Sequence, residues 1–505
     1  MRTPSTLAAA GAAVLATLTG TAVAHLVAGA TDPASSPVIA VGSAVIDATP
    51  TPVKEWAIAT FGTWDKPILL GSVLVGVLGL AVVIGLLARR SFSLGAALMV
   101  ALVATAGAAA VTRPEAGALA ALPAVVAGVV GVGALWWLVG RTAARRGTGA
   151  ADGPTRRGVL LGAGLLAVVA AGSGAAGQWL ARARAIPASV TLPSAIKRLA
   201  PLPAGLERRI RGISPFRTPN ADFYRVDTRL TLPVVDPGEW TLTIDGDVDR
   251  EVSFTFAEIL AMDLVERDIT LTCVSNEVGG QYVGAARWLG VPLTSLLDRA
   301  GIANTRADQI LSTDVDGMTI STPLAVALDG REPLLAVGMN GAPLPQAHGF
   351  PARLVTPGIY GYVGSTKWVT RLTLTTYAEQ QAYWTERKWA TDAPIKVSSR
   401  IDTPRPLSTT DAGEIVVAGV AWAQQRGIGK VEVRIDGGPW QEARLGPDAG
   451  VDYWRQWFLP WDARPGMHQL EVRATAEDGE QQTAVRAAPF PEGSSGIQQI
   501  TVTVT

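Results

Sequence analysis

Long apolar stretches fill the first 180 residues of the chain, and shorter ones alternate with polar residues after that point. Five uncharged stretches are long enough to cross the roughly 30 Å hydrocarbon core of a bilayer as helices. They are Thr3–Thr31, Ile68–Ala88, Ser91–Thr112, Ala116–Gly140 and Gly158–Ala181. The pattern therefore predicts an N-terminal five-helix transmembrane region, residues 1–181, followed by a linker, residues 182–213.

The pattern after the linker is that of a soluble protein. Residues alternate between apolar and polar at Trp240–Ile244 and Asp268–Cys273, which predicts strands, and Phe256–Met262 and Leu293–Ala300 are predicted as short helices. Because strands and helices follow one another without regular alternation, residues 214–398 are predicted to form an α+β domain.

Residues 399–505 contain only predicted strands. Turns at Asp436–Gly438 and Glu477–Gly479 separate some of them, and such short strands at regular spacing indicate an immunoglobulin-like β-sandwich. The strands are Glu414–Ala421, Lys430–Ile435, Trp454–Leu459, His468–Ala474 and Ile497–Thr505.

The charged residues support this division of the chain. Residues 1–180 hold 17 of the 86 Asp, Glu, Lys and Arg residues. The 43 basic and 43 acidic residues cancel, which gives no electrostatic reason to expect a nucleic-acid partner.

Eight basic residues that flank the predicted spans fall on one side of a five-span topology. By the positive-inside rule that side is cytoplasmic, so we expect a multi-pass protein of the cell membrane with its N-terminus in the cytoplasm. The soluble half then lies outside the cytoplasm. The last span by itself indicates this only weakly, because the basic residues after it are nearly as many as those before it. The residues on the predicted inner side are Arg2, Arg89, Arg90, Arg141, Arg145, Arg146, Arg156 and Arg157.

Two interpretations are open for Arg156 and Arg157, which directly precede the last span. The pair resembles a twin-arginine (Tat) export signal placed inside the chain, and it is equally typical of a positive anchor. Export by that route becomes attractive only if the soluble half must fold around a cofactor before it crosses the membrane. The spans themselves contain no Asp or Glu and one histidine, His25, so we expect anchoring rather than transport or haem ligation.

Cys273 is the only cysteine, which excludes an internal disulfide and a Cys-rich zinc or iron–sulfur site. It ends a predicted strand and precedes polar and glycine residues. A lone cysteine is often a buried apolar residue, and it can equally be a thiolate ligand of a transition metal whose other donors come from a cofactor. The spacing alone favours neither.

A second candidate region is the glycine-rich segment Pro357–Trp368, which carries hydroxyl groups and Lys367. Backbone N–H groups and a cation in such a loop can bind phosphate, and the alternative is an ordinary surface loop.

Three blocks together resemble the molybdopterin domain of the sulfite oxidase family, in the order in which the family has them: Leu271–Val291, Met339–Arg353 and Pro357–Trp368. The resemblance implies that residues 214–398 form a molybdopterin-binding catalytic domain of sulfite oxidase type with a Mo-molybdopterin cofactor. It implies that Cys273 is the metal ligand. It also implies a set of cofactor-binding residues: Asn220, Phe223, Tyr224, Thr313, His348, Arg353, Ser365, Thr366 and Lys367.

The same resemblance implies that residues 399–505 are a dimerisation domain, which makes a homodimer possible. An arginine of that domain reaches the substrate pocket in the family, and Arg455 is the matching candidate for a catalytic residue. The alternative for Arg455 is a strand arginine paired at the surface.

Three family positions that handle sulfite differ in this chain. Val226, with Arg225 beside it, stands where one substrate arginine is expected, Glu277 and Val278 stand where a second is expected, and the tyrosine near the metal falls at Met318. A small anion confined away from water needs cationic partners, so we expect a small-molecule substrate other than sulfite.

The sequence thus predicts a membrane-anchored molybdenum oxidoreductase that performs oxo transfer outside the cytoplasm and exchanges electrons with a separate redox partner protein. A cofactor that must be inserted before export also favours the Tat interpretation of Arg156 and Arg157. The alternative is a non-catalytic cell-surface or interaction protein that retains the cofactor-binding fold.

Overall fold

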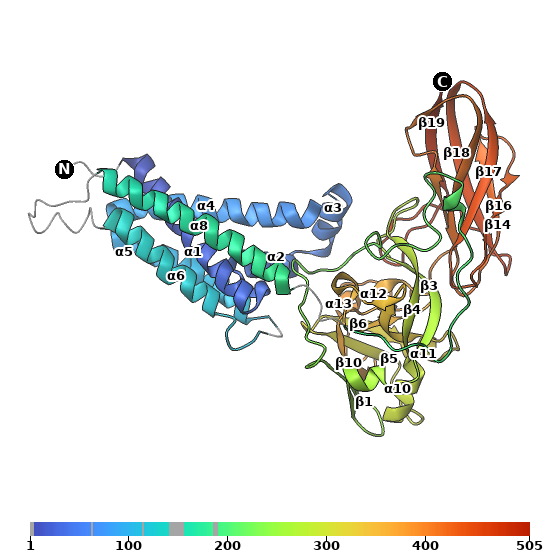
Figure 1. The fold of residues 1–505 in the computed structure, drawn as a ribbon, viewed down its shortest axis with the longest axis horizontal. Helices are drawn as coiled ribbons and strands as arrows, with labels where there is room; N and C mark the ends of the chain where they lie inside the picture. Colours follow the sequence, from blue (N-terminus) through green and yellow to red (C-terminus); the bar gives the residue numbers. More distant parts are fainter. Residues whose placement is uncertain (1–4, 62–63, 114–115, 141–155, 185–189) are drawn as a thin grey trace, which may run out of the picture. The chain divides into compact units, whose positions relative to one another are not determined.

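A computed structural model describes residues 5–61, 64–113, 116–140, 156–184 and 190–505, which form two compact units (Figure 1). One unit contains residues 1–186 and 227–234. The other contains residues 187–226 and 235–505.

The first unit is helical. Helix α1 packs against α4, α6 and α8 through small residues, because a Cβ atom on Gly20 would lie 2.6 Å from the carbonyl oxygen of Ala127. Close backbone approach of this kind is typical of helices that associate in a membrane. The elements are α1 (Thr6–Ala30), η1 (Pro33–Ser35), α2 (Pro37–Ala48), α3 (Thr51–Phe61), α4 (Asp65–Arg90), α5 (Phe92–Val111), α6 (Leu122–Leu135), η3 (Trp136–Gly140) and α8 (Arg156–Arg184).

Five of these helical segments are long and apolar enough to cross a membrane, which confirms the five predicted stretches as helices: Thr6–Ala30, Asp65–Arg90, Phe92–Val111, Leu122–Val139 and Arg157–Ala181. Helices α2 and α3, between the first two spans, were not predicted. Arg2, Arg141, Arg145 and Arg146, on which the predicted orientation partly depends, lie outside the described residues. The orientation in the membrane therefore stays a prediction.

The α+β part of the second unit contains two mixed or antiparallel sheets. One has the strand order β2-β1-β10-β5-β6, and the other has the order β3-β4-β7-β8 with β9 paired to β7. Their elements are η4 (Leu206–Arg208), β1 (Thr241–Gly246), β2 (Val252–Thr255), α9 (Phe256–Leu260), β3 (Val265–Thr272), β4 (Val283–Pro292), α10 (Leu293–Ala300), β5 (Gln309–Asp314), β6 (Thr319–Pro323), α11 (Leu324–Leu328), β7 (Leu334–Met339), β8 (Ala342–Pro343), η5 (Gln346–His348), β9 (Arg353–Val355), α12 (Gly361–Gly364), β10 (Val369–Thr375) and α13 (Tyr383–Glu386).

Local sequence explains several of these elements. Thr255 and Glu258 form a capping box that starts α9. Helix α10 presents Leu293, Leu296, Leu297 and Ala300 to the main core, and Gly301 ends it in the left-handed conformation. Asn340 and Gly341, both at positive φ, make the two-residue turn between β7 and β8.

The C-terminal part of the second unit is a β-sandwich (Figure 1). Its sheets have the orders β11-β13-β17-β16 and β12-β19-β18-β14-β15, and both sheets contribute to one core around the fully buried Trp457. The strands are β11 (Ser398–Thr403), β12 (Thr409–Thr410), β13 (Gly413–Trp422), β14 (Ile428–Ile435), β15 (Gln441–Glu442), β16 (Arg444–Leu445), β17 (Arg455–Ala463), β18 (Gly466–Ala476) and β19 (Gln498–Val504). The five predicted strands correspond to β13, β14, β17, β18 and β19, and β11 was missed because its alternation is short.

His468 makes the stability of the sandwich depend on pH. Its Nδ1 lies 2.7 Å from Asp436 Oδ2 and its Nε2 lies 2.8 Å from the carbonyl oxygen of Arg464, and the hydrogen bond to Asp436 raises the pKa of His468. Because the folded pKa is raised, we expect the stabilisation to be complete below the unfolded pKa of about 6.5 and to be lost as pH rises through the folded pKa. Titration of the ring by NMR should show a raised midpoint, and Asp436→Asn should lower it toward the ordinary value of about 6.5. An unshifted midpoint in the parent protein would contradict this.

Candidate functional site

Cys273 lies in the loop that connects β3 to β4. Its backbone N–H donates to the carbonyl oxygen of Tyr282 at 2.9 Å, and its own carbonyl accepts from Asn276 N–H at 3.0 Å. The thiol is half-buried, and burial raises its pKa, while hydrogen bonds from Ser275 and the charge of Lys367 oppose that shift. The charge of Lys367 therefore does not offset the effect of burial, and a bound metal ion would favour the thiolate further.

The loop after Cys273 is held in place from two sides. Asn276 Oδ1 accepts from Tyr282 N–H at 2.8 Å, and a Cβ atom on Gly280 would lie 2.6 Å from that oxygen. The sandwich supports the same loop, because Arg400 donates to the carbonyl oxygen of Gly280 at 2.7 Å and Ser494 donates to that of Asn276 at 2.5 Å. The position of the thiol thus depends on both parts of the second unit.

A buried guanidinium is the most unusual feature of the site. Arg353, at the start of β9, is 5% exposed and donates only to carbonyl oxygens, of His348 at 3.1 Å and of Leu354 and Ser365 at 3.4 Å. Burial lowers the pKa of Arg353 to about 10. Among the described residues no carboxylate pairs with it. Since a buried charge is costly unless it is paired, the position calls for an anion that the protein does not supply.

His348 and Lys367 lie beside Arg353. Burial and the charge of Arg353 lower the pKa of His348 to about 4, so the ring is neutral, and its Nε2 donates to the carbonyl oxygen of Asn220 at 3.1 Å. A Cβ atom on Gly349 would meet Arg353 and Lys367 at about 3 Å, so only glycine lets the chain pass between them. The three side chains form one cationic cluster with a neutral imidazole at its edge.

Asn220, Phe223 and Tyr224 form a wall of the site. The Asn220 amide is occupied by the β7–β8 turn, since it donates to the carbonyl oxygen of Met339 at 3.1 Å and accepts from Asn340 at 2.7 Å. Phe223 packs edge-on against Trp288 and His348 and stacks on Tyr224 at 5.2 Å. Burial raises the pKa of Tyr224, and the charge of Cys273 raises it further.

The glycine-rich segment completes the cluster. Ser365 is buried, and its Oγ has no hydrogen-bond partner among the described residues. Thr366 is also buried, and its hydroxyl is 2.5 Å from that of Ser312. Lys367 Nζ lies 3.3 Å from the carbonyl oxygen of Val226 and over the ring of Trp368. An orphaned hydroxyl beside the buried guanidinium of Arg353, which has no carboxylate partner among the described residues, is the arrangement that an anionic group would satisfy.

Two predicted residues are not brought to this cluster by any described interaction. Thr313 follows Ser312 in β5, and because successive side chains of a strand point to opposite faces, its hydroxyl points away from Thr366. Arg455 is tied to its own domain, at 2.7 Å from Asp448 and 3.0 Å from the carbonyl oxygen of Gly446. Their proposed roles stay predictions.

The structure also shows where the residues lie that differ from the sulfite oxidase pattern. Arg225 and Val226 are exposed, and Arg225 lies close enough to lower the pKa of His348. Glu277 is exposed in the loop after Cys273, and Met318 lies in the turn between β5 and β6, where its N–H donates to Asp314. The structure thus places an acidic residue four positions beyond the thiol.

Sequence reasoning missed three residues of the site. Tyr360 is buried and close enough to Cys273 that the thiolate charge helps raise the Tyr360 pKa to about 12, after burial. Asn340 was predicted only as part of the block Met339–Arg353, and Arg400 only as part of the sandwich, residues 399–505. Their contacts with Asn220 and Gly280 cross between segments far apart in sequence, so no local pattern could have indicated them.

The fold and the site together define the class of protein domain. This is an α+β domain with one accessible thiol beside a buried cationic cluster, suited to an anionic group that also carries a metal. Residues 229–384 match the family model described as "Oxidoreductase molybdopterin binding domain". Residues 229–384 therefore form a molybdopterin-binding oxidoreductase domain similar to that of sulfite oxidases, and such a domain implies a Mo-molybdopterin cofactor.

Named relatives agree with this assignment. The chain is 31% identical over 307 residues to mitochondrial sulfite oxidase from Homo sapiens, which covers 52% of this chain and 56% of that protein. It is 28% identical over 309 residues to inducible NADH nitrate reductase 2 from Glycine max, covering 49% of this chain and 34% of that one. The chain thus spans about half the length of the sulfite oxidases it matches.

A solved structure shares the fold. The sulfane dehydrogenase SoxCD from Paracoccus pantotrophus superposes with a TM-score of 0.51 at 24% identity, over 57% of this chain and 81% of that chain.

The residues present fit the implied cofactor. Cys273 would supply a thiolate for the metal, and Arg353, Lys367 and the Ser365 hydroxyl would supply donors for a phosphate. Thr366 and His348 already have partners within the protein, so they hold the cluster in shape.

Proposed function

We propose that the chain is a membrane-anchored molybdenum-cofactor oxidoreductase that performs oxo transfer on the extracytoplasmic side, on a substrate other than sulfite. The observation that carries the proposal is the buried Arg353 without a carboxylate partner, next to an orphaned Ser365 hydroxyl and on the same side as Cys273. A protein that had lost its cofactor would have no reason to keep this uncompensated charge.

The chain's own residues have separate tasks. When bound, the cofactor supplies two-electron oxygen-atom transfer between a small molecule and water. Cys273 ligates the metal as a thiolate, and Arg353 and Lys367 hold the phosphate. Phe223, Tyr224 and Tyr360 line the site with rings, and their burial excludes water from the thiol.

The substrate is inferred from what stands near the thiol. Glu277 is exposed in the same loop, four residues after Cys273, where its charge disfavours an anion, and Met318 stands where the resemblance implies a tyrosine. We expect a neutral or weakly charged acceptor or donor of oxygen, such as an S-oxide or an N-oxide.

The proposal is tested by metal analysis and a turnover screen. Full-length protein made in a molybdenum-replete host should contain about one molybdenum and one pterin per chain. It should turn over S-oxides or N-oxides with a small artificial electron donor faster than it oxidises sulfite. Protein without stoichiometric molybdenum would favour the alternative of a non-catalytic cell-surface or interaction protein.

Membrane insertion and export form a second part of the proposal. The five long apolar helices support a multi-pass anchor, and a cofactor inserted in the cytoplasm supports export of a folded domain by the Tat route.

We expect Arg156→Lys together with Arg157→Lys to leave the soluble half in the cytoplasm, because the charge is kept while the paired guanidinium groups are lost. Protease protection in spheroplasts measures this. Continued export of the double variant would show that the pair is only a topological anchor.

The sandwich is proposed to be of immunoglobulin type and to support a homodimer. Two packed sheets that share one core support the first point. Sedimentation of the detergent-solubilised protein tests the second.

A further inference from the structure

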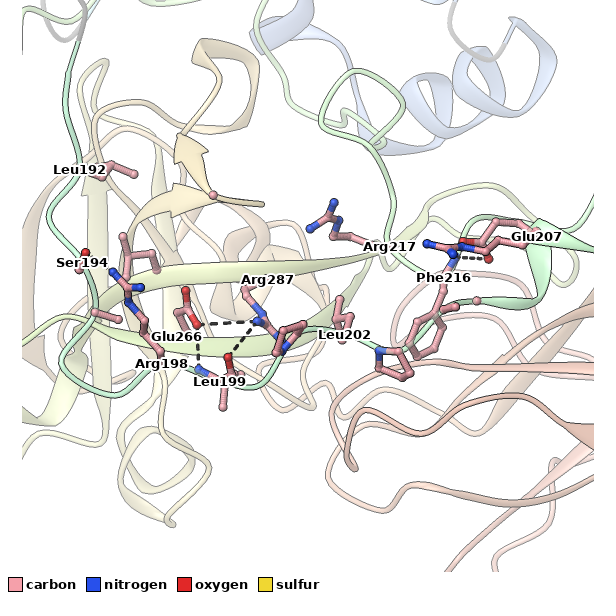
Figure 2. Close-up of a pocket in the computed structure, with 18 of the residues that line it drawn as sticks. Leu192, Ser194, Arg198, Leu199, Leu202, Glu207, Phe216, Arg217, Glu266 and Arg287 are labelled. Carbon is pink, nitrogen blue, oxygen red and sulfur yellow. Dashed lines mark hydrogen bonds and ion pairs between the residues drawn. The ribbon is translucent and has the colours of Figure 1, made fainter.

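A groove of about 700 Å³ lies in the second unit, and its lining includes none of Arg353, His348 and Lys367 (Figure 2). One wall is the extended segment from Leu192 to Arg217, and the other is formed by Glu266 of β3 and Arg287 and Leu289 of β4. A second cavity of about 410 Å³ shares Ala204, Gly205 and Arg208 with the first and reaches the sandwich at Leu445–Pro447. The two cavities therefore border the same part of the extended segment.

The acidic residues of the groove are already engaged. Glu266 accepts from Leu199 N–H at 2.8 Å and lies 3.8 Å from Arg287 (Figure 2). Glu207 accepts from Phe216 N–H at 3.1 Å and from Gln456 at 3.0 Å. Neither carboxylate is left to neutralise the remaining charges.

Arg287 is paired with Asp268, but three other arginines of the groove are not neutralised. Arg198, Arg208 and Arg217 are exposed, and in the described part of the chain none of them has an ion pair. Arg198 donates only to Ser194, and Arg209 of the adjoining cavity lies over the ring of Phe458 at 5.7 Å. A row of unpaired guanidinium groups along a groove attracts an acidic surface and steers its approach.

The wall of the groove is in contact with the core beneath Cys273. Phe216 packs edge-on against Tyr453 at 5.1 Å, and its carbonyl accepts from the indole of Trp454 at 2.7 Å. Trp454 N–H donates to Thr270 Oγ1 at 2.8 Å, and Thr270 lies three residues before Cys273 in β3. Val274 belongs to the same packed cluster as Phe216 and Trp454. A packed aromatic layer therefore connects the groove to the residue next to the thiol.

We infer that this groove docks the acidic face of a one-electron carrier protein. The inference rests on the proposed function, which requires a separate redox partner. Each oxygen-atom transfer moves two electrons, so two carrier molecules dock in turn, and each gains or loses one electron. A concave groove with three unpaired arginines along one wall fits a protruding acidic segment better than the flat surface of a membrane.

Two forms of one carrier test the inference. Native cytochrome c is basic, and succinylated cytochrome c carries the same haem with its lysines converted to carboxylates. We expect the full-length protein in neutral nanodiscs to bind the succinylated form at least tenfold more tightly than the native form at low salt, and to lose that preference as ionic strength rises.

Charge reversal locates the surface. Arg198→Glu, Arg208→Glu and Arg217→Glu together should weaken binding of succinylated cytochrome c at least tenfold. The matched control reverses three exposed arginines outside the groove, Arg250→Glu, Arg405→Glu and Arg486→Glu, and should change affinity less than threefold. Equal effects of the two triple variants would overturn the inference.

A membrane role for the same arginines is a distinct outcome. If the groove triple variant loses binding to phosphatidylglycerol vesicles while its affinity for succinylated cytochrome c is unchanged, the arginines face anionic lipid and the inference is wrong. Both triple variants should keep parental molybdenum content and parental turnover with a small donor. If the parent protein itself contained no molybdenum or showed no turnover with a small donor, the proposed function would be refuted instead.

Discussion

Replacing Cys273 by serine should abolish turnover while the protein stays folded. We expect a loss of at least about 10³-fold, because a hydroxyl is not ionised at neutral pH and is a poor substitute for a thiolate ligand. Unfolding should change by less than about 1 kcal/mol, since the thiol is only half-buried and its loop is held by backbone hydrogen bonds. The visible absorption of a thiolate-ligated molybdenum centre should disappear.

The matched control for this variant is Thr272→Ser, one residue earlier at the end of β3. It keeps the hydroxyl that accepts from Gln424 and removes only a methyl group, so turnover should stay within a few-fold of the parent. Should Cys273→Ser retain molybdenum-dependent turnover, Cys273 is a buried apolar residue and another side chain holds the metal.

Much of the fold was predictable because local sequence patterns indicate its helices and strands. The five spans, α10, and strands β13, β14 and β18 follow from periodicity and from turn residues, and the structure has them within a few residues of the expected bounds. What periodicity could not give is how strands pair, since β1 lies next to β10, more than 120 residues later.

The site was predictable by resemblance and only partly by chemistry. Cys273, His348, Arg353, Ser365 and Lys367 lie together as expected from the family.

Arg400 supports the loop after Cys273 from the sandwich, whereas Arg455, the arginine chosen from sequence, pairs with Asp448. That choice depended on which face of the sandwich meets the α+β part, and a strand pattern does not show which edge or face meets another domain.

Replacing Arg353 by methionine should separate cofactor binding from stability. Burial depresses the pKa of Arg353 from 12.5 to about 10, which corresponds to roughly 3 kcal/mol of unfavourable free energy for the charged form at neutral pH. Methionine removes that cost and fills similar volume, but leaves the carbonyl groups of His348 and Ser365 without their donor. We therefore expect the cofactor-free variant to unfold within about 2 kcal/mol of the cofactor-free parent, while its molybdenum and pterin content falls at least tenfold.

Arg400→Met is the contrasting variant, because Arg400 is equally buried but pairs with Asp402 at 2.7 Å. Removing one partner of a buried pair should destabilise the protein by about 3–5 kcal/mol with or without cofactor. Arg353→Lys keeps the charge without the planar fork and should retain an intermediate cofactor content. If Arg353→Met instead bound cofactor like the parent, and unfolded as easily as Arg400→Met, the guanidinium would serve the fold alone and the anion site would have to lie elsewhere.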